Sequence, residues 1–111
     1  MDGPLVITGI NGQVGKALLA EAKSRGLNVV GLNREQLDLT EIESIALKLD
    51  AHKPSAIINP AAYTAVDKAE EEEPRASLIN AQAPSVMAAY CRKKDIPFIH
   101  FFRKRKKIIQ K

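Results

Sequence analysis

A glycine-rich stretch directly after an apolar run constrains the fold of this chain more than any other feature. The run Leu5-Val6-Ile7 is followed by Thr8-Gly9-Ile10-Asn11-Gly12-Gln13-Val14-Gly15. We interpret this as a buried strand, a phosphate-binding turn and a helix that starts near Gly12. Gly9 would allow the tight turn, Gly12 the close approach of a pyrophosphate, and Gly15 the close packing of helix on strand. Free backbone N–H groups and the positive end of the helix dipole would face the phosphates.

The three glycines are spaced G-x-x-G-x-x-G rather than G-x-G-x-x-G, so the triplet alone also fits an ordinary turn before a helix. The following residues favour the phosphate-binding interpretation. Apolar residues recur at helical spacing up to Ser24, and Gly26 stands where a helix commonly ends. Residues 27–32 then predict a second strand. The result is a β-α-β unit of the length expected of a dinucleotide-binding fold.

The rest of the chain continues to alternate between strands and helices. Thr40-Glu41-Ile42-Glu43 matches a capping box, which predicts a helix that begins at Glu41 and ends before Lys53. Further elements are predicted as a strand over 56–59, helical pieces over 67–73 and 75–80, a helix over 84–94 and a strand over 97–101. Continuously apolar strands between helices predict an α/β, Rossmann-like parallel sheet covered on both faces. About four strands make this fold incomplete, and the expected strand order is 3-2-1-4.

We expect one partial NAD(P)-binding domain over residues 1–101 and a basic tail over residues 102–111. The net charge is +4, but the tail holds six of the 17 lysines and arginines, which leaves residues 1–101 slightly acidic. A solvated, disordered tail is favoured over one that binds nucleic acid or an anionic surface, because no aromatic residue follows Phe102. The apolar strand over 97–101 would lie at a sheet edge, so self-association through this truncated edge stays open.

The sequence gives little support for a membrane segment, a nucleophilic cysteine or a metal site. There is no 18-residue apolar run and no signal-peptide pattern, so we expect a cytoplasmic protein without a membrane partner. Cys91 is predicted to be a packed thiol rather than a nucleophile. Residues 70–73 are interpreted as a solvated acidic turn of helix, and no metal site is predicted.

The end of the second predicted strand bears on the choice of cofactor. An Asp or Glu at this point would bind the adenosine ribose hydroxyls, but Asn33-Arg34 stands there instead. A guanidinium suits the 2′-phosphate of NADP, although a surface arginine without a ligand explains the residue equally well. The sequence therefore favours NADPH and leaves NADH open.

Three segments together resemble the dTDP-4-dehydrorhamnose reductase family, extended short-chain dehydrogenases/reductases of bacterial sugar-nucleotide synthesis. They are residues 9–15, 34–40 and 59–70, of which the last, Asn59-Pro60-Ala61-Ala62-Tyr63-Thr64-Ala65-Val66-Asp67-Lys68-Ala69-Glu70, discriminates best. The resemblance covers residues 1 to about 101. It implies the following contacts with a dinucleotide: the glycine-rich loop with Asn11, Gln13 and Val14 at the pyrophosphate, Asn33 and Arg34 at the ribose, Asp38 and Leu39 at the adenine, and Ala61, Ala62 and Tyr63 along the nicotinamide ribose.

The chain departs from the family at two places. Pro60 stands where the family usually has alanine, which removes one backbone donor at the edge of the cofactor cleft. After Phe101 the resemblance predicts Ser-Thr-Asp-Tyr-Val-Phe, but the chain reads Phe102-Arg103-Lys104-Arg105-Lys106-Lys107. The family's catalytic hydroxyl is therefore missing, as is its later Tyr-x-x-x-Lys pair, in which lysine lowers the pKa of the proton-donating tyrosine.

A second Tyr-x-x-x-Lys pattern occurs at Tyr90 to Lys94. We interpret it as a chance match, because the helix from Pro84 carries these residues away from the nucleotide-binding edge of the sheet. No catalytic residue is predicted.

These observations predict an NAD(P)-binding fragment of a dTDP-4-dehydrorhamnose reductase-like oxidoreductase. Its sequence departs from the family near Phe102, by frameshift or truncation, and we expect the fragment to be inactive alone. The resemblance implies a parent reaction, the NAD(P)H-dependent reduction of dTDP-4-dehydro-L-rhamnose to dTDP-L-rhamnose, with Mg²⁺ only in the full-length family. The alternative is a noncatalytic module that binds a dinucleotide or a partner and uses its basic tail.

Overall fold

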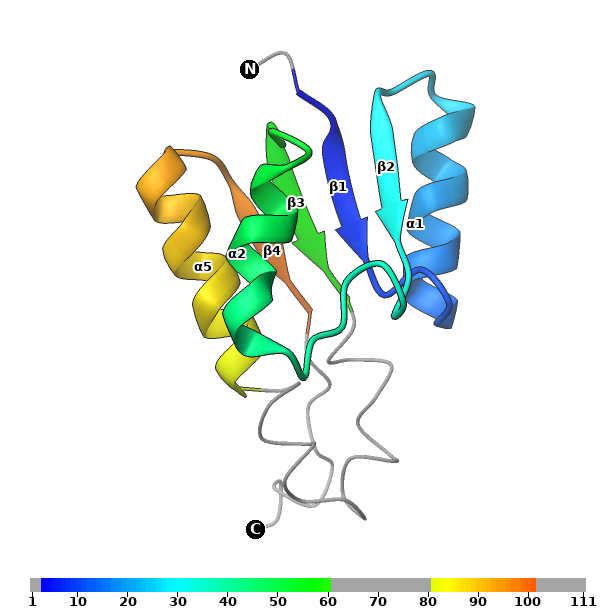
Figure 1. Cartoon of the computed structure of the whole chain (residues 1–111). Coiled ribbons are helices and arrows are strands. Elements are labelled where there is room, and N and C mark those ends of the chain that lie inside the picture. Colours follow the sequence, from blue (N-terminus) through cyan, green and yellow to red (C-terminus); the bar gives the residue numbers. More distant parts are fainter. Residues whose placement is uncertain (1–2, 61–80, 102–111) are drawn as a thin grey trace, which may run out of the picture.

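The structure is a computed structural model that describes residues 3–60 and 81–101. These residues form one parallel sheet of four strands and three helices (Figure 1). The strands are β1 (Leu5–Thr8), β2 (Val29–Leu32), β3 (Ala56–Asn59) and β4 (Phe98–His100). The helices are α1 (Gln13–Ser24), α2 (Ile42–Asp50) and α5 (Ala83–Lys94). The predicted α/β class with a Rossmann-like parallel sheet is confirmed.

The strands lie in the order β2-β1-β3-β4. The expected order 3-2-1-4 is wrong, because β3 pairs with β1 and not with β2. The connection through α2 carries the chain past β1, so that Ile45 and Leu49 of α2 join Val6 of β1 and Ile57 of β3 in one core. As a result α1 lies on one side of the sheet, and α2 and α5 lie together on the other (Figure 1).

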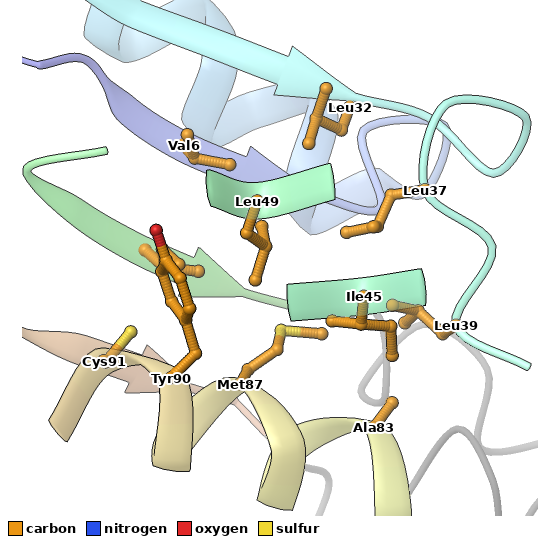
Figure 2. Close-up of a cluster of buried hydrophobic side chains, with 11 residues drawn as sticks. Val6, Leu32, Leu37, Leu39, Ile45, Leu49, Ala83, Met87, Tyr90 and Cys91 are labelled. Carbon is orange, nitrogen blue, oxygen red and sulfur yellow. The ribbon is translucent and has the colours of Figure 1, made fainter. Parts of the chain in front are cut away.

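The main hydrophobic core fills the space between the sheet and helices α2 and α5 (Figure 2). Val6 and Ile57 of the sheet are fully buried, as are Ile45 of α2 and Met87 of α5. Such side chains contribute roughly 1.5–3 kcal/mol each when removed from water. This core fixes helices α2 and α5 against one face of the sheet.

Helix α2 starts differently from the prediction. It begins at Ile42 with Glu41 as its N-cap, and no side chain caps it. The predicted capping box is wrong because Thr40 Oγ1 donates to Asp38 Oδ1 instead, at 2.6 Å. The backbone N–H of Thr40 donates to the same oxygen, at 2.9 Å. These two bonds hold Thr40 in a turn with Asp38, and Glu41 rather than Thr40 occupies the N-cap position.

The other predicted elements that the structure describes are confirmed within a few residues. Helix α1 begins beside Gly12, and Pro84 lies in the first turn of α5. The predicted helical pieces over 67–73 and 75–80 and the basic tail over 102–111 lie outside the described residues. Within the described part of the chain, the helices are all too short or too polar to span a bilayer.

Candidate functional site

The order of the strands reverses between β1 and β3. The chain leaves β1 through α1 to reach β2 on one side, whereas β3 is followed by β4 on the other side. In open α/β sheets a ligand binds outside the carboxyl ends of the strands at such a reversal. The strand arrowheads in Figure 1 point to this edge, and the loop from Gly9 to Gly12 lies there.

Gly9 and Gly15 lie as the glycine spacing predicts, Gly9 at a tight turn and Gly15 at a close packing contact. Gly9 has a φ of 59°, in the left-handed region that favours glycine. Its carbonyl oxygen accepts a 3.2 Å hydrogen bond from the Gly12 backbone N–H, which closes the turn. A Cβ on Gly15 would lie 2.1 Å from the same carbonyl oxygen. The start of α1 therefore packs directly on the turn, with no room for a side chain.

The start of α1 is open to an anion. Gly12 is its N-cap, no side chain among residues 3–60 and 81–101 caps the helix, and no acidic residue occurs in its first turn. The first helical hydrogen bond is donated by the Lys16 backbone N–H to the Gly12 carbonyl oxygen, at 2.9 Å. The backbone N–H groups of Gln13, Val14 and Gly15 precede this bond and have no partner within the helix. A phosphate fits this arrangement of donors and helix dipole.

The middle of the loop is anchored by Ile10, which the sequence analysis did not identify. A Cβ on Gly31 of β2 would lie 2.9 Å from Ile10 Cγ2 and 2.9 Å from Leu19 Cδ2. The absence of a side chain at Gly31 thus makes room for Ile10 between strand and helix. Gly31 interrupts an otherwise apolar strand, and a glycine at such a position can signal a close approach of this kind.

Asn33 and Arg34 follow β2 at the same edge of the sheet. The Asn33 side chain accepts a 2.9 Å hydrogen bond from the Gln36 backbone N–H. In return, the Asn33 backbone N–H donates to Gln36 Oε1 at 2.9 Å. This reciprocal pair fixes the turn in which Arg34 sits, and the Arg34 side chain is exposed. Asn33 therefore acts as a structural residue of the turn that presents Arg34.

Asp38 and Leu39 lie in the loop before α2. The Asp38 carboxylate is held by the two hydrogen bonds from Thr40. The Leu39 side chain is buried in the main core (Figure 2), which leaves only its backbone for contact with a nucleotide. Ala61, Ala62 and Tyr63 lie outside the described residues, so their predicted place along the nicotinamide ribose stays a prediction.

Three polar side chains at the same edge were also missed by the sequence analysis. Thr8 Oγ1 donates to Asn59 Oδ1 at 2.5 Å, and Asn59 Nδ2 lies 3.3 Å from His100 Nδ1. Thr8 and Asn59 are almost completely buried. The signal in the sequence is that Thr8 and Asn59 each close a short apolar run, which places them at the carboxyl ends of their strands; His100 carries no such signal, because Phe101 and Phe102 follow it.

Tyr90 and Lys94 lie at the C-terminal end of α5, away from this edge. Tyr90 is buried, and its hydroxyl donates to Asp50 Oδ1 at 2.9 Å. Burial first, and then the bond to Asp50, raise the pKa of Tyr90 well above its ordinary value. A proton-donating tyrosine needs a lowered pKa, so this environment agrees with a chance match to Tyr-x-x-x-Lys. Lys94 Nζ lies 3.4 Å from Asp50 Oδ1 and thus completes a link between α5 and α2.

Cys91 and the acidic residues that the structure describes form no further site. Cys91 is buried, as predicted, and burial raises the pKa of its thiol to about 11. Over residues 3–60 and 81–101, no three His, Cys, Asp or Glu side chains are grouped to hold a metal ion.

Comparisons with known proteins agree with this geometry. The sequence profile of the family described as "RmlD substrate binding domain" matches residues 3–102. A dTDP-4-dehydrorhamnose reductase of Mycolicibacterium smegmatis is 40% identical over 96 residues, which are 86% of this chain and 29% of the relative. The probable low-salt glycan biosynthesis reductase Agl14 of Haloferax volcanii is 34% identical over 86% of this chain and 35% of its own length.

A solved structure shows the same arrangement of strands and helices. The crystal structure of dTDP-4-dehydrorhamnose reductase from Bacillus anthracis, in complex with NADP, superposes with a TM-score of 0.74 at 33% identity. The superposition covers 88% of this chain and 35% of that one. The chain thus spans about a third of the length of the relatives that it matches.

Proposed function

This chain belongs to the RmlD substrate binding domain family, and on that premise we propose that it binds NADP(H) at the carboxyl edge of its sheet. The observation that carries the proposal is the uncapped start of α1, which packs on the Gly9 turn through Gly15. The relative from Bacillus anthracis, which was solved with NADP, supports a nicotinamide dinucleotide as the ligand.

The described residues divide the work of binding between two places. The backbone N–H groups at the start of α1 would hold the pyrophosphate, because a helix N-terminus without a competing carboxylate favours an anion. Arg34, presented by the Asn33–Gln36 turn, would hold the 2′-phosphate of the adenosine ribose. We therefore propose a preference for NADPH over NADH.

We further propose that this chain is the cofactor-binding part of a reductase that acts on a 4-keto sugar nucleotide of the dTDP-4-dehydro-L-rhamnose type. The bound reduced nicotinamide supplies the hydride in such a reaction. The described residues of this chain bind and orient the dinucleotide, but Tyr90 and Lys94 are held by Asp50 at the other end of the sheet. We expect binding of NADPH without sugar reduction by this chain alone.

Calorimetric titration of the purified chain with NADPH tests the proposal, with Gly12→Val as the disrupting variant. Gly12 has φ −83° and ψ 169°, an extended conformation that valine also adopts, so the variant should fold while its side chain obstructs the phosphate. Ala20→Val, on the exposed surface of α1, is the control. Binding by the wild type and the control, lost in Gly12→Val, supports the proposal. A wild-type chain that binds neither NADPH nor NADH refutes it.

A further inference from the structure

Thr8, Asn59 and His100 form a row across three neighbouring strands. Each is the last residue of its strand, in β1, β3 and β4. Asn59 is paired with His100 in the register of the sheet, and Thr8 follows the paired residues Ile7 and Ile58. Because side chains alternate along a strand, the row shares a face with Val6, Ile57 and Phe98, which belong to the main core or pack against it.

Hydrogen bonds run along the row and set the orientation of the Asn59 amide. The Thr8 hydroxyl donates to Asn59 Oδ1, so Asn59 Nδ2 faces the other way, toward His100 Nδ1 at 3.3 Å. An amide nitrogen only donates, so this contact requires a His100 Nδ1 that accepts. The same Nδ1 lies 3.3 Å from the Asn59 carbonyl oxygen, to which it could donate only in the other tautomer, with the proton on Nδ1. We take the tautomer with the proton on Nε2, which gives the buried Asn59 amide its acceptor. Asn59 is completely buried, and a buried amide without an acceptor is costly.

The His100 ring is itself held in place on β4. It stacks on the Phe98 ring with a centroid distance of 6.1 Å and an interplanar angle of 6°. Phe98 packs against the main core. The ring is thus supported by the core while its Nδ1 reaches across to β3.

The Thr8–Asn59 bond spans the reversal of strand order between β1 and β3. Thr8 immediately precedes Gly9, where the glycine-rich loop turns out of the sheet, and Asn59 immediately precedes the buried Pro60. The bond therefore fixes the relative positions of Thr8 and Asn59, where the chain leaves the sheet on either side of the reversal. These two strand ends flank the place where the dinucleotide would bind.

We propose that His100 is a positioning residue for the dinucleotide, which acts by orienting the Asn59 amide so that Asn59 holds Thr8 and the start of the glycine-rich loop. The inference rests on the proposed function. His100 does not need to touch the cofactor, because its effect passes through two side-chain hydrogen bonds to the residue before Gly9.

Two substitutions separate this role from simple packing. In His100→Asn the side-chain oxygen takes about the place of Nδ1 and still accepts from Asn59. In His100→Phe the ring and its stacking on Phe98 are kept, but the acceptor is lost. We expect His100→Asn to bind NADPH like the wild type and His100→Phe to bind about fivefold more weakly. Equal binding by wild type and His100→Phe, or equal weakening in both variants, would overturn the proposal.

A measurement on the chain without cofactor distinguishes failure of the positioning role of His100 from failure of the proposed NADPH binding. The amide ¹H and ¹⁵N shifts of Gly9 and Gly12 in the free chain should change in His100→Phe and stay close to wild type in His100→Asn. If the wild type binds no NADPH, the proposed function fails, yet these shifts still decide whether His100 positions the loop. Unchanged shifts in His100→Phe contradict the positioning role even if NADPH binds.

Thr8→Val tests the same row of hydrogen bonds at its other end, and so keeps the proposal testable if the His100→Phe chain does not fold. Valine keeps the shape of threonine but removes the hydroxyl at the other end of the row. It should produce the same shift changes at Gly9 that the loss of the histidine acceptor produces. In the Thr8→Val background, His100→Phe should have little further effect on NADPH affinity, since the path to the loop is already broken. Full additivity of the two substitutions would contradict the proposal.

Discussion

Gly15 packs on Gly9 so closely that a side-chain carbon at Gly15 would lie 2.1 Å from the Gly9 carbonyl oxygen. The turn that leaves β1 and the first turn of α1 therefore form one unit. Because Gly9 has a positive φ and Gly12 donates back to its carbonyl, the unit has little freedom to rearrange. Its exposed end is the set of backbone donors at the start of α1.

A negative charge in the first turn of α1 should separate stability from binding. Gln13→Glu places a carboxylate beside the positive end of the helix dipole, which should raise the free energy of unfolding by about 0.3–1 kcal/mol. The same carboxylate repels the pyrophosphate, so NADPH should bind roughly tenfold more weakly. Urea unfolding and calorimetry measure the two effects.

Ala20→Glu is the matched control for this charge change. Ala20 is also exposed and lies about 10 Å further along α1, beyond the reach of the helix dipole and of most screened repulsion. It should leave both quantities close to wild type. Tighter binding of NADPH by Gln13→Glu would contradict the assignment of the pyrophosphate to this helix end.

Arg34 should decide between the two dinucleotides. Arg34→Ala should weaken NADPH binding by roughly ten- to a hundredfold, the usual contribution of a hydrogen-bonded charge pair, and should leave NADH binding nearly unchanged. Arg25→Ala is the control, because Arg25 is exposed at the other end of α1 and pairs with Glu21 at 2.6 Å. Parallel losses for NADPH and NADH in Arg34→Ala would assign Arg34 a purely structural role.

The elements of this fold were predictable because their signals are local. The apolar runs at 5–8 and 56–59 and the proline at position 84 mark strands and a helix start within a few residues. The order of the strands was not predictable in this way. Whether β3 pairs with β1 or with β2 depends on the core that α2 shares with α5, and that core joins residues far apart in the sequence.

The candidate site shows the same division between local and distant interactions. The conformations of Gly9 and Gly15 follow from the glycine spacing, and both agree with the prediction. The capping box was predicted wrongly because Thr40 forms a turn with Asp38, two residues before it, and Glu41 becomes the N-cap. The link from Thr8 to Asn59 spans 51 residues, so no local pattern announces it.

Tyr90 should matter for stability and not for binding. Tyr90→Phe removes the hydroxyl that donates to Asp50 and should lower the free energy of unfolding by about 1 kcal/mol at neutral pH. This hydroxyl is also the main cause of the lowered pKa of Asp50. A lowered folded-state pKa adds stability that is lost as the pH falls through that value, so the difference between wild type and variant should shrink in acid. Urea unfolding at pH 7 and pH 3 measures both effects, and altered NADPH affinity in Tyr90→Phe would contradict this assignment.

Cys91 should make the fold sensitive to alkali. Its thiol has a pKa of about 11 in the folded chain, against an ordinary value of 9.0. In this interval the unfolded chain releases the proton first, so the free energy of unfolding falls as the pH rises from about 9 to about 11. Cys91→Ala lacks this titration. The stability difference between wild type and Cys91→Ala should therefore decrease across the interval. Tyr90 is present in both proteins, and its interaction with Cys91 is the last of the causes that raise its pKa. A constant difference would contradict the burial of the thiol.

The contact of Ile10 with Gly31 should couple β2 to the glycine-rich loop. Gly31→Ala places a Cβ 2.9 Å from Ile10 Cγ2 and from Leu19 Cδ2, so these side chains must move, at a cost of about 1–3 kcal/mol in stability. Because Ile10 belongs to the glycine-rich loop, we also expect weaker NADPH binding. Ile10→Ala removes the two Ile10 methyl groups nearest to the new Cβ, leaves Leu19 Cδ2 in place, and should itself be destabilising. The double variant should lose about 1 kcal/mol less stability than the sum of the two single losses, because Ile10→Ala makes room for the new methyl group. Urea unfolding of the four proteins gives this coupling, and strictly additive losses would show that Ile10 does not link the loop to β2.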